Sequence, residues 1–217
     1  TPILYATRRM KVASVVGARP QFIKAAALSP VLRQRAVEIV IHTGQHYDFE
    51  MSQLFFDQLR LPEPDFHLGV GSGSHAQQTG AMLPRIEEVL TTVRPDWVLV
   101  YGDTNSTLAG ALAAAKLQLP VAHVEAGMRS FVRGMAEEIN RVVTDSIADI
   151  LWTPSPDGDA NLRREGVAPE KIERVGNIMI DTLEMLRPRI ESENAFERFG
   201  LKSGGYGVVT LHRPSNV

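Results

Sequence analysis

The fold is decided by residues 97–127, which read WVLVYGDTNSTLAGALAAAKLQLPVAHVEAG. Two short apolar runs, 97–101 and 121–124, enclose an alanine-rich stretch at 106–117. Runs that are apolar on both faces are typical of parallel strands covered by helices on both sides. The alanine-rich stretch predicts a helix that can pack closely on a sheet. This segment therefore predicts a strand, a crossover helix and a second parallel strand.

The same alternation continues in both directions along the chain. We expect further strands at 11–16, 37–41, 150–153 and 172–175, and helices at 21–32, 49–59 and 76–93. Pro84 is expected to kink or divide the last of these helices, and a Pro- and Gly-rich loop is expected at 62–74. Strands that alternate with helices predict an α/β fold with a doubly wound, Rossmann-like parallel sheet.

The carboxy-terminal part breaks this rhythm. Helical stretches near 178–186 and 194–199 lead to a predicted strand at 206–211. Such a strand should be followed by a helix, so we predict that it opens a second domain that is truncated. The expected organisation is an extension at 1–9, a Rossmann-like domain at 10–203, and the first strand and loop of a carboxy-terminal domain at 204–217.

Composition narrows the class of protein. The chain has 217 residues, a formal net charge of -2 and no cysteine. The charge gives no support for nucleic-acid binding, and the missing thiols exclude disulfides and thiolate metal sites. No apolar run approaches the roughly 20 residues that span a bilayer, and the first nine residues lack the order of a signal peptide. We expect a cytoplasmic protein without membrane contact.

Acidic residues stand at three successive loop positions. Asp103 and Glu125 each follow a predicted strand, and Glu137 opens a predicted helix. In an open α/β sheet the strand ends face one crevice, where ligands bind. Each residue also has a plainer reading, as a helix cap, a surface charge that could pair with Arg129, or a first-turn acid that favours the helix dipole. Three carboxylates at one crevice favour an active site.

A second candidate site joins the first strand to its helix. Gly17-Ala18-Arg19-Pro20 forms a turn at a helix N-terminus, where free N–H groups bind phosphate, and Arg19 and Lys24 would strengthen it; the plainer reading is two solvated cations. The chain lacks the G-x-G-x-x-G and P-loop patterns, and its six histidines show no paired metal spacing. We therefore expect neither a bound dinucleotide nor a metal.

Seven motifs, taken in order, resemble the non-hydrolysing UDP-N-acetylglucosamine 2-epimerases of bacteria. They are Gly17-Ala18-Arg19-Pro20, Gly44-Gln45-His46, Gly102-Asp103-Thr104-Asn105-Ser106, His123-Val124-Glu125-Ala126-Gly127-Met128-Arg129-Ser130, Glu137-Glu138-Ile139-Asn140-Arg141, Gly176-Asn177 and Leu211-His212-Arg213-Pro214-Ser215-Asn216-Val217. The resemblance implies two Rossmann-like domains around a cleft, as in the B-type glycosyltransferase fold, of which this chain supplies the first half. Ala136 and Ser215 depart from the commonest family pattern, where a Pro and a Glu are frequent.

The resemblance also implies an activity. The family converts UDP-N-acetylglucosamine to UDP-N-acetylmannosamine, for polysaccharide biosynthesis, by elimination and re-addition of UDP without a cofactor. Asp103, Glu125 and Glu137 would be the acid–base groups, and His212 would assist the leaving group. Three alternatives stay open: a 2-epimerase of a diacetamido uronate nucleotide, a hydrolysing 2-epimerase, and an inactive domain or binding module.

The remaining implied roles concern binding. The residues expected to bind the UDP-sugar are Arg19, Lys24, Arg141 and Arg213. Gln45 and His46 match a region linked in the family to a second, activating UDP-sugar. The full-length protein is expected to be a homodimer, and the 217-residue chain alone is expected to be inactive because it lacks most of the nucleotide-binding domain.

Overall fold

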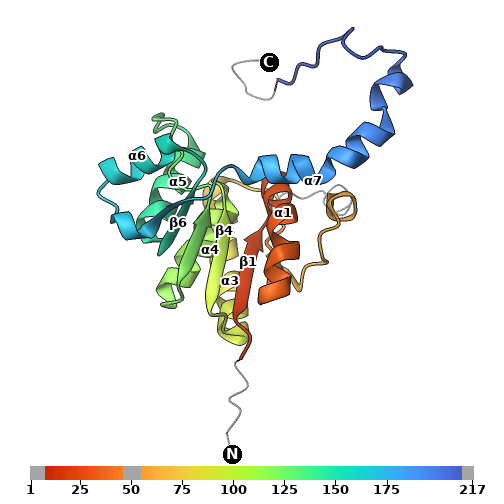
Figure 1. Cartoon of the computed structure of the whole chain (residues 1–217). Helices are drawn as coiled ribbons and strands as arrows, with labels where there is room; N and C mark the ends of the chain where they lie inside the picture. The colour runs from red at the N-terminus through yellow and green to blue at the C-terminus, as the bar shows by residue number, and fades with distance from the viewer. Residues whose placement is uncertain (1–7, 46–54, 212–217) are drawn as a thin grey trace, which may run out of the picture. The chain divides into compact units, whose positions relative to one another are not determined.

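A computed structural model describes residues 8–45 and 55–211. Its centre is a seven-stranded sheet, all parallel, in the order β3-β2-β1-β4-β5-β6-β7 (Figure 1). The strands are β1 (Lys11–Val16), β2 (Val37–His42), β3 (Phe66–His67), β4 (Trp97–Tyr101), β5 (Val121–Val124), β6 (Ile150–Thr153) and β7 (Ile172–Arg174). The predicted doubly wound, Rossmann-like sheet is confirmed.

The strand order reverses between β1 and β4. The chain first builds outward from β1 to β2 and β3, then returns to β4 and continues to β7. In open parallel sheets, ligands bind beside the carboxyl ends of the strands at such a reversal. The fold therefore places the ends of β1 and β4, and of β5 next to them, at the predicted crevice.

Helices cover the sheet and connect its strands. They are α1 (Arg19–Arg35), α3 (His75–Val93), α4 (Asn105–Lys116), α5 (Ala136–Ile147), α6 (Pro156–Arg164) and α7 (Ile178–Glu193), with the short 3₁₀ helices η1 (Pro169–Lys171) and η2 (Ala195–Phe199). Pro84 lies inside α3 and does not divide it. Its ring removes one backbone hydrogen bond, while the burial of Met82, Ile86 and Leu90 holds both halves of the helix on the sheet.

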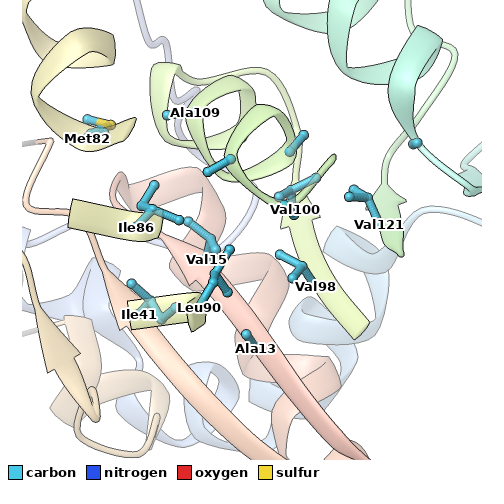
Figure 2. Close-up of a cluster of buried hydrophobic side chains, with 14 of the residues drawn as sticks. Ala13, Val15, Ile41, Met82, Ile86, Leu90, Val98, Val100, Ala109 and Val121 are labelled. Carbon is cyan, nitrogen blue, oxygen red and sulfur yellow. The ribbon is translucent and has the colours of Figure 1, made fainter. Parts of the chain in front are cut away.

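Strand β1 divides its side chains between the two faces of the sheet. Ala13 and Val15 join the apolar cluster built with α3 and α4 (Figure 2). The hydroxyl of Ser14 instead donates to Glu38 at 2.8 Å, and Glu38 also accepts from Ser29 of α1. Because side chains alternate along a strand, α1 covers the face opposite to α3 and α4.

Three local features of the structure differ from what the sequence predicts. The loop predicted at 62–74 contains the edge strand β3, which two residues are enough to form once they pair with β2. Helix α6 was not predicted. Residues 206–211 form no strand in the described part of the chain, because no neighbouring strand there pairs with their backbone. Of the helix predicted at 49–59, residues 55–59 are helical and 49–54 lie outside the described residues.

The chain divides into two compact units, Thr1–Thr182 and Leu183–Val217. The first contains the whole sheet and every described residue of the site discussed below, while the second contains most of α7 and η2. The domain boundary expected after residue 203 stays a prediction. Across the described ranges, no helix has both the length and the apolar character needed to cross a bilayer.

Candidate active site

The turns that follow β4 and β5 lie side by side. The N–H of Gly102 donates to the carbonyl of Val124 at 2.9 Å, so the two strands stay paired to their last residues. Asp103 follows β4 after Gly102, and Glu125 follows β5 directly. The sheet thus brings two of the three predicted carboxylates to neighbouring turns at its carboxyl edge.

Glu125 forms an ion pair with Lys24 of α1. The Lys24 ammonium lies 2.6 Å from Oε2 of Glu125, and the two side chains are 7% and 28% exposed. Glu125 also has a φ of 71°, a left-handed conformation that is uncommon for a residue with a side chain and recurs at functional sites. The alternative pairing of Glu125 with Arg129 does not form, since the Arg129 guanidinium binds Asp145 and Glu165 instead.

Gly102 makes room for the Lys24 ammonium. Its φ is 64°, and a methyl group added at its Cα would lie 2.7 Å from Nζ of Lys24. A side chain here would both strain the backbone and displace the ammonium from Glu125. Glycine is the residue that satisfies both demands.

Asp103 is bound by Arg141 of α5. The Nε of Arg141 donates to Oδ2 of Asp103 at 3.0 Å, and its Nη1 donates to Glu138 at 2.9 Å. Burial opposes the charge of Arg141, but the two carboxylates outweigh it and hold its pKa above the ordinary value. Arg141 thereby links helix α5 to the turn after β4.

The adjacent residues Glu137 and Glu138 have different surroundings. Glu138 is buried and accepts from the N–H groups of Ser130 and Phe131, at 2.9 and 3.0 Å. Burial disfavours its charge, yet these N–H groups, the Ser130 hydroxyl and Arg141 hold its pKa below the ordinary value. Glu137 is half-buried, and its side chain has no hydrogen bond or ion pair within the ranges that the structure describes. Of the two, Glu137 is the carboxylate left available for a reacting molecule.

The turn after β1 differs from the predicted phosphate site. The N–H groups of Gly17 and Ala18 donate to the side-chain oxygen of Gln21, at 2.8 and 3.1 Å. The expectation that they are free for phosphate is therefore wrong. Arg19 is exposed and lies over the ring of Phe55, 6.0 Å from its centre. The structure does not bring Arg19 and Lys24 together as a pair of solvated cations, since Lys24 is buried.

Gln45 lies against the first turn of α4, beside the site. Its side-chain oxygen accepts from the N–H and the hydroxyl of Ser106, at 3.0 and 2.7 Å. It thus satisfies one of the free N–H groups of that helix N-terminus. The other residues given a role, His46, His212 and Arg213, lie outside the described residues.

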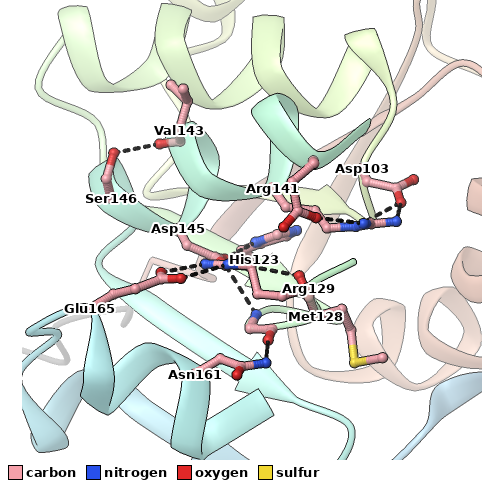
Figure 3. A network of polar contacts seen from close by, with 12 residues as sticks. Asp103, His123, Met128, Arg129, Arg141, Val143, Asp145, Ser146, Asn161 and Glu165 are labelled. Carbon is pink, nitrogen blue, oxygen red and sulfur yellow. Dashed lines mark hydrogen bonds and ion pairs between the residues drawn. The ribbon is translucent and has the colours of Figure 1, made fainter. Parts of the chain in front are cut away.

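A buried polar network beneath the two turns was not predicted. His123 contacts Asp145 of α5, and Asp145 also binds Arg129 (Figure 3). One signal in the sequence points to it: His123 interrupts an apolar strand, where a polar side chain needs a buried partner. The partner itself lies on a helix and carries no local mark.

These groups suit proton transfer to and from a bound molecule. Asp103 and Glu125 are each paired with a cation, so both carboxylates lie next to a positive charge. Glu137 and Arg141 lie four residues apart, on one face of α5. The site therefore offers carboxylates on two turns and one helix, with cations next to Asp103 and Glu125.

Known proteins share this architecture. A sequence profile of the UDP-N-acetylglucosamine 2-epimerase family matches residues 31–217. A UDP-N-acetylglucosamine 2-epimerase homolog of Methanococcus maripaludis is 53% identical over 96% of this chain, and a UDP-2,3-diacetamido-2,3-dideoxy-D-glucuronate 2-epimerase of Pseudomonas aeruginosa is 49% identical over 96%.

Solved structures agree with the sequence match. The UDP-GlcNAc 2-epimerase of Methanocaldococcus jannaschii, solved with UDP-GlcNAc and UDP, superposes with a TM-score of 0.84 at 46% identity and covers 88% of this chain and 53% of its own. Acinetobacter baumannii MurG superposes with a TM-score of 0.50 at 13% identity, over 77% of this chain and 45% of its own, and shares the fold alone. The chain spans 58% and 59% of the two relatives named above. By the profile match and these identities, the chain belongs to the UDP-N-acetylglucosamine 2-epimerase family.

Proposed function

We propose that the protein containing this chain interconverts UDP-N-acetylglucosamine and UDP-N-acetylmannosamine by inverting carbon 2 of the sugar. The observation that carries the proposal is the Lys24–Glu125 ion pair beside Asp103, at the carboxyl edge of β4 and β5. It supplies charged acid–base groups where this fold binds ligands. Membership of the family supports the substrate.

The chemistry requires such groups. Carbon 2 has no neighbouring carbonyl, so its proton is not acidic. A base removes that proton as the bond between carbon 1 and the diphosphate oxygen breaks. The C–H electrons form a double bond between carbons 1 and 2, and the C–O electrons leave with UDP. Re-addition of UDP at carbon 1 and of a proton on the opposite face of carbon 2 gives the epimer. Positioned acids and bases accelerate such transfers roughly 10²–10⁴-fold.

The proposed roles are proton transfer and assistance to the leaving group. Asp103, Glu125 and Glu137 exchange protons with the sugar, and the Lys24 ammonium holds the Glu125 side chain in place. We propose that His212 assists the departure of the diphosphate.

Arginine side chains bind the nucleotide part of the UDP-sugar. Arg19, Arg141 and Arg213 bind the nucleotide. A second carboxy-terminal domain, beginning near residue 204, completes the other wall of the cleft, so the 217-residue chain alone is inactive. Gln45 and His46 take part in binding a second, activating UDP-sugar.

A diacetamido uronate nucleotide is the second candidate substrate. The Pseudomonas aeruginosa relative named for that activity is 49% identical to this chain, close to the 53% of the homolog from Methanococcus maripaludis. Both substrates undergo the same inversion at carbon 2, so the proton-transfer groups would serve either. A panel of UDP-sugars, with kcat/KM measured for each, separates the two.

The test is incubation of the full-length protein with UDP-N-acetylglucosamine, followed by proton NMR. We expect UDP-N-acetylmannosamine to accumulate to a constant ratio without free UDP. Free N-acetylmannosamine and UDP rising together would instead identify a hydrolysing enzyme, and an unchanged substrate would remove the proposal. We further propose a cytoplasmic homodimer that supplies polysaccharide biosynthesis, and light scattering of the full-length protein tests its oligomeric state.

A further inference from the structure

His123 is fully buried in β5, and both of its ring nitrogens face hydrogen-bond acceptors. Its Nδ1 lies 2.6 Å from Oδ1 of Asp145 (Figure 3), and its Nε2 lies 2.7 Å from the carbonyl oxygen of Gly102. A carbonyl oxygen can only accept, so Nε2 carries a proton. The state of Nδ1 then depends on whether Asp145 is ionised.

Asp145 is surrounded by donors. The N–H of Gly127 donates to Oδ2 at 3.0 Å, and the Arg129 guanidinium lies 2.8 Å from the same oxygen. The backbone N–H of Gly127 and the positive charge of Arg129 both favour the ionised form of Asp145. An ionised carboxylate accepts and does not donate. Nδ1 therefore carries a proton as well, and the ring is an imidazolium.

The charges of the network balance with a charged ring. The Arg129 side chain is 1% exposed and also pairs with Glu165, with 2.6 Å between Nη2 and Oε2. Two cations, His123 and Arg129, then face two anions, Asp145 and Glu165. With a neutral ring the network would carry one excess negative charge next to Asp145, whose side chain is 1% exposed, and burial disfavours such a charge.

The network fixes both turns of the candidate active site. His123 holds the carbonyl of Gly102, which precedes Asp103, and Asp145 holds the N–H of Gly127, two residues after Glu125. Asp145 of α5 is thus connected to both turns. It reaches the turn bearing Asp103 through His123 and bonds the turn bearing Glu125 directly, so it sets the position of one turn relative to the other.

We propose that His123, kept doubly protonated by Asp145, is a positioning residue that locks the turns bearing Asp103 and Glu125 into one arrangement. The protonation state is independent of the reaction. Its catalytic consequence rests on the proposed function, because the positioned groups are those that exchange protons with the sugar.

Nitrogen-15 NMR of the histidine rings in the full-length protein tests the protonation state. His123→Gln assigns the His123 signals by their disappearance. We expect both ring nitrogens to be protonated at neutral pH, and Asp145→Asn to leave a neutral ring that is protonated at Nε2 alone, since the asparagine amide can donate to Nδ1. A neutral His123 in the unaltered protein would overturn the proposal, and this measurement requires no variant to be active.

Kinetics test the positioning. His123→Leu removes the bond to Gly102, and a misplacement of catalytic groups by about 1 Å lowers rates roughly 100-fold. We expect kcat to fall by about that factor with KM changed less than about 3-fold, and His123→Gln, whose amide can donate to the same carbonyl, to recover roughly 10-fold of the loss. Ser146→Ala on the outer side of α5, which removes a bond to Val143 alone, is the matched control.

The outcomes separate the two proposals. If His123→Leu folds, as judged by circular dichroism, and keeps the kcat of the control, the positioning role is wrong while the proposed function stands. If the unaltered protein shows no epimerisation, the proposed function fails, and the NMR measurement still decides whether His123 is an imidazolium.

Discussion

Replacement of Gly102 by alanine adds a methyl group where the backbone passes close to the Lys24 ammonium. The backbone there has a φ of 64°, and the new methyl group would lie 2.7 Å from the Lys24 ammonium. Two effects follow: strain of a left-handed alanine, and displacement of Lys24 from Glu125. Gly166→Ala separates them, because Gly166 has a φ of 84° and no described atom lies within 4 Å of its added methyl.

The magnitudes follow from this geometry. A left-handed alanine costs about 1–2 kcal/mol, and both variants bear this cost. The methyl group meets only the far end of the flexible Lys24 side chain, so Lys24 shifts and its pairing with Glu125 weakens, at a further cost of about 1 kcal/mol. Gly102→Ala should therefore lose about 2–3 kcal/mol of unfolding free energy, and Gly166→Ala about 1–2 kcal/mol, so the fall in Tm should be larger for Gly102→Ala.

Thermal unfolding and steady-state kinetics of the full-length protein check this prediction. We expect Gly102→Ala to lose at least about 100-fold in kcat/KM, and Gly166→Ala to keep the activity of the unaltered protein. Equal falls in Tm for the two variants, together with retained activity in Gly102→Ala, would refute the role assigned to the Lys24–Glu125 pair.

Three further predictions concern single side chains. Glu137→Gln should lower kcat by roughly 10²-fold or more without changing Tm; unchanged kcat would remove Glu137 from the catalytic groups. Glu138→Gln should instead cost about 1–3 kcal/mol and speed amide hydrogen exchange at Ser130 and Phe131, which it binds; unaltered exchange would contradict that role. Burial, aided by His67, lowers the pKa of His42 from 6.5 to about 4. Between pH 6.5 and about 4, His42 is protonated in the unfolded chain but neutral in the folded protein. The free energy of unfolding should therefore decrease by about 1.4 kcal/mol for each pH unit that the pH falls through this range. Urea unfolding at pH 7 and 5 should show a loss about 2 kcal/mol smaller in His42→Gln than in the unaltered protein; equal losses would count against a neutral, buried His42.

The central strands could be predicted to the residue, and the reason is local. The runs at 97–101, 121–124 and 150–153 are bounded by polar residues or turns, so pattern alone sets their ends. The strand predicted at 206–211 failed because a strand also needs a partner, which no local pattern supplies. The two-residue β3 forms for the converse reason, since pairing with β2 creates it.

The candidate site divides in the same way. Asp103 and Glu125 could be placed at one edge of the sheet because both follow strands. Their partners could not be predicted, since Lys24 lies on a helix far away in the sequence and the pairing depends on how α1 packs. His123 was visible only as a polar residue in an apolar strand, and its function depends on Asp145, which a single sequence does not connect to it.

The most direct test of the account follows the hydrogen on carbon 2. The full-length protein is incubated with UDP-N-acetylglucosamine in deuterated water, and the recovered UDP-sugars are analysed by NMR and mass spectrometry. The account predicts deuterium at carbon 2 in both the product and the recovered substrate, with greatly reduced incorporation for Glu137→Gln. Conversion without deuterium at carbon 2, or no conversion at all, would contradict it.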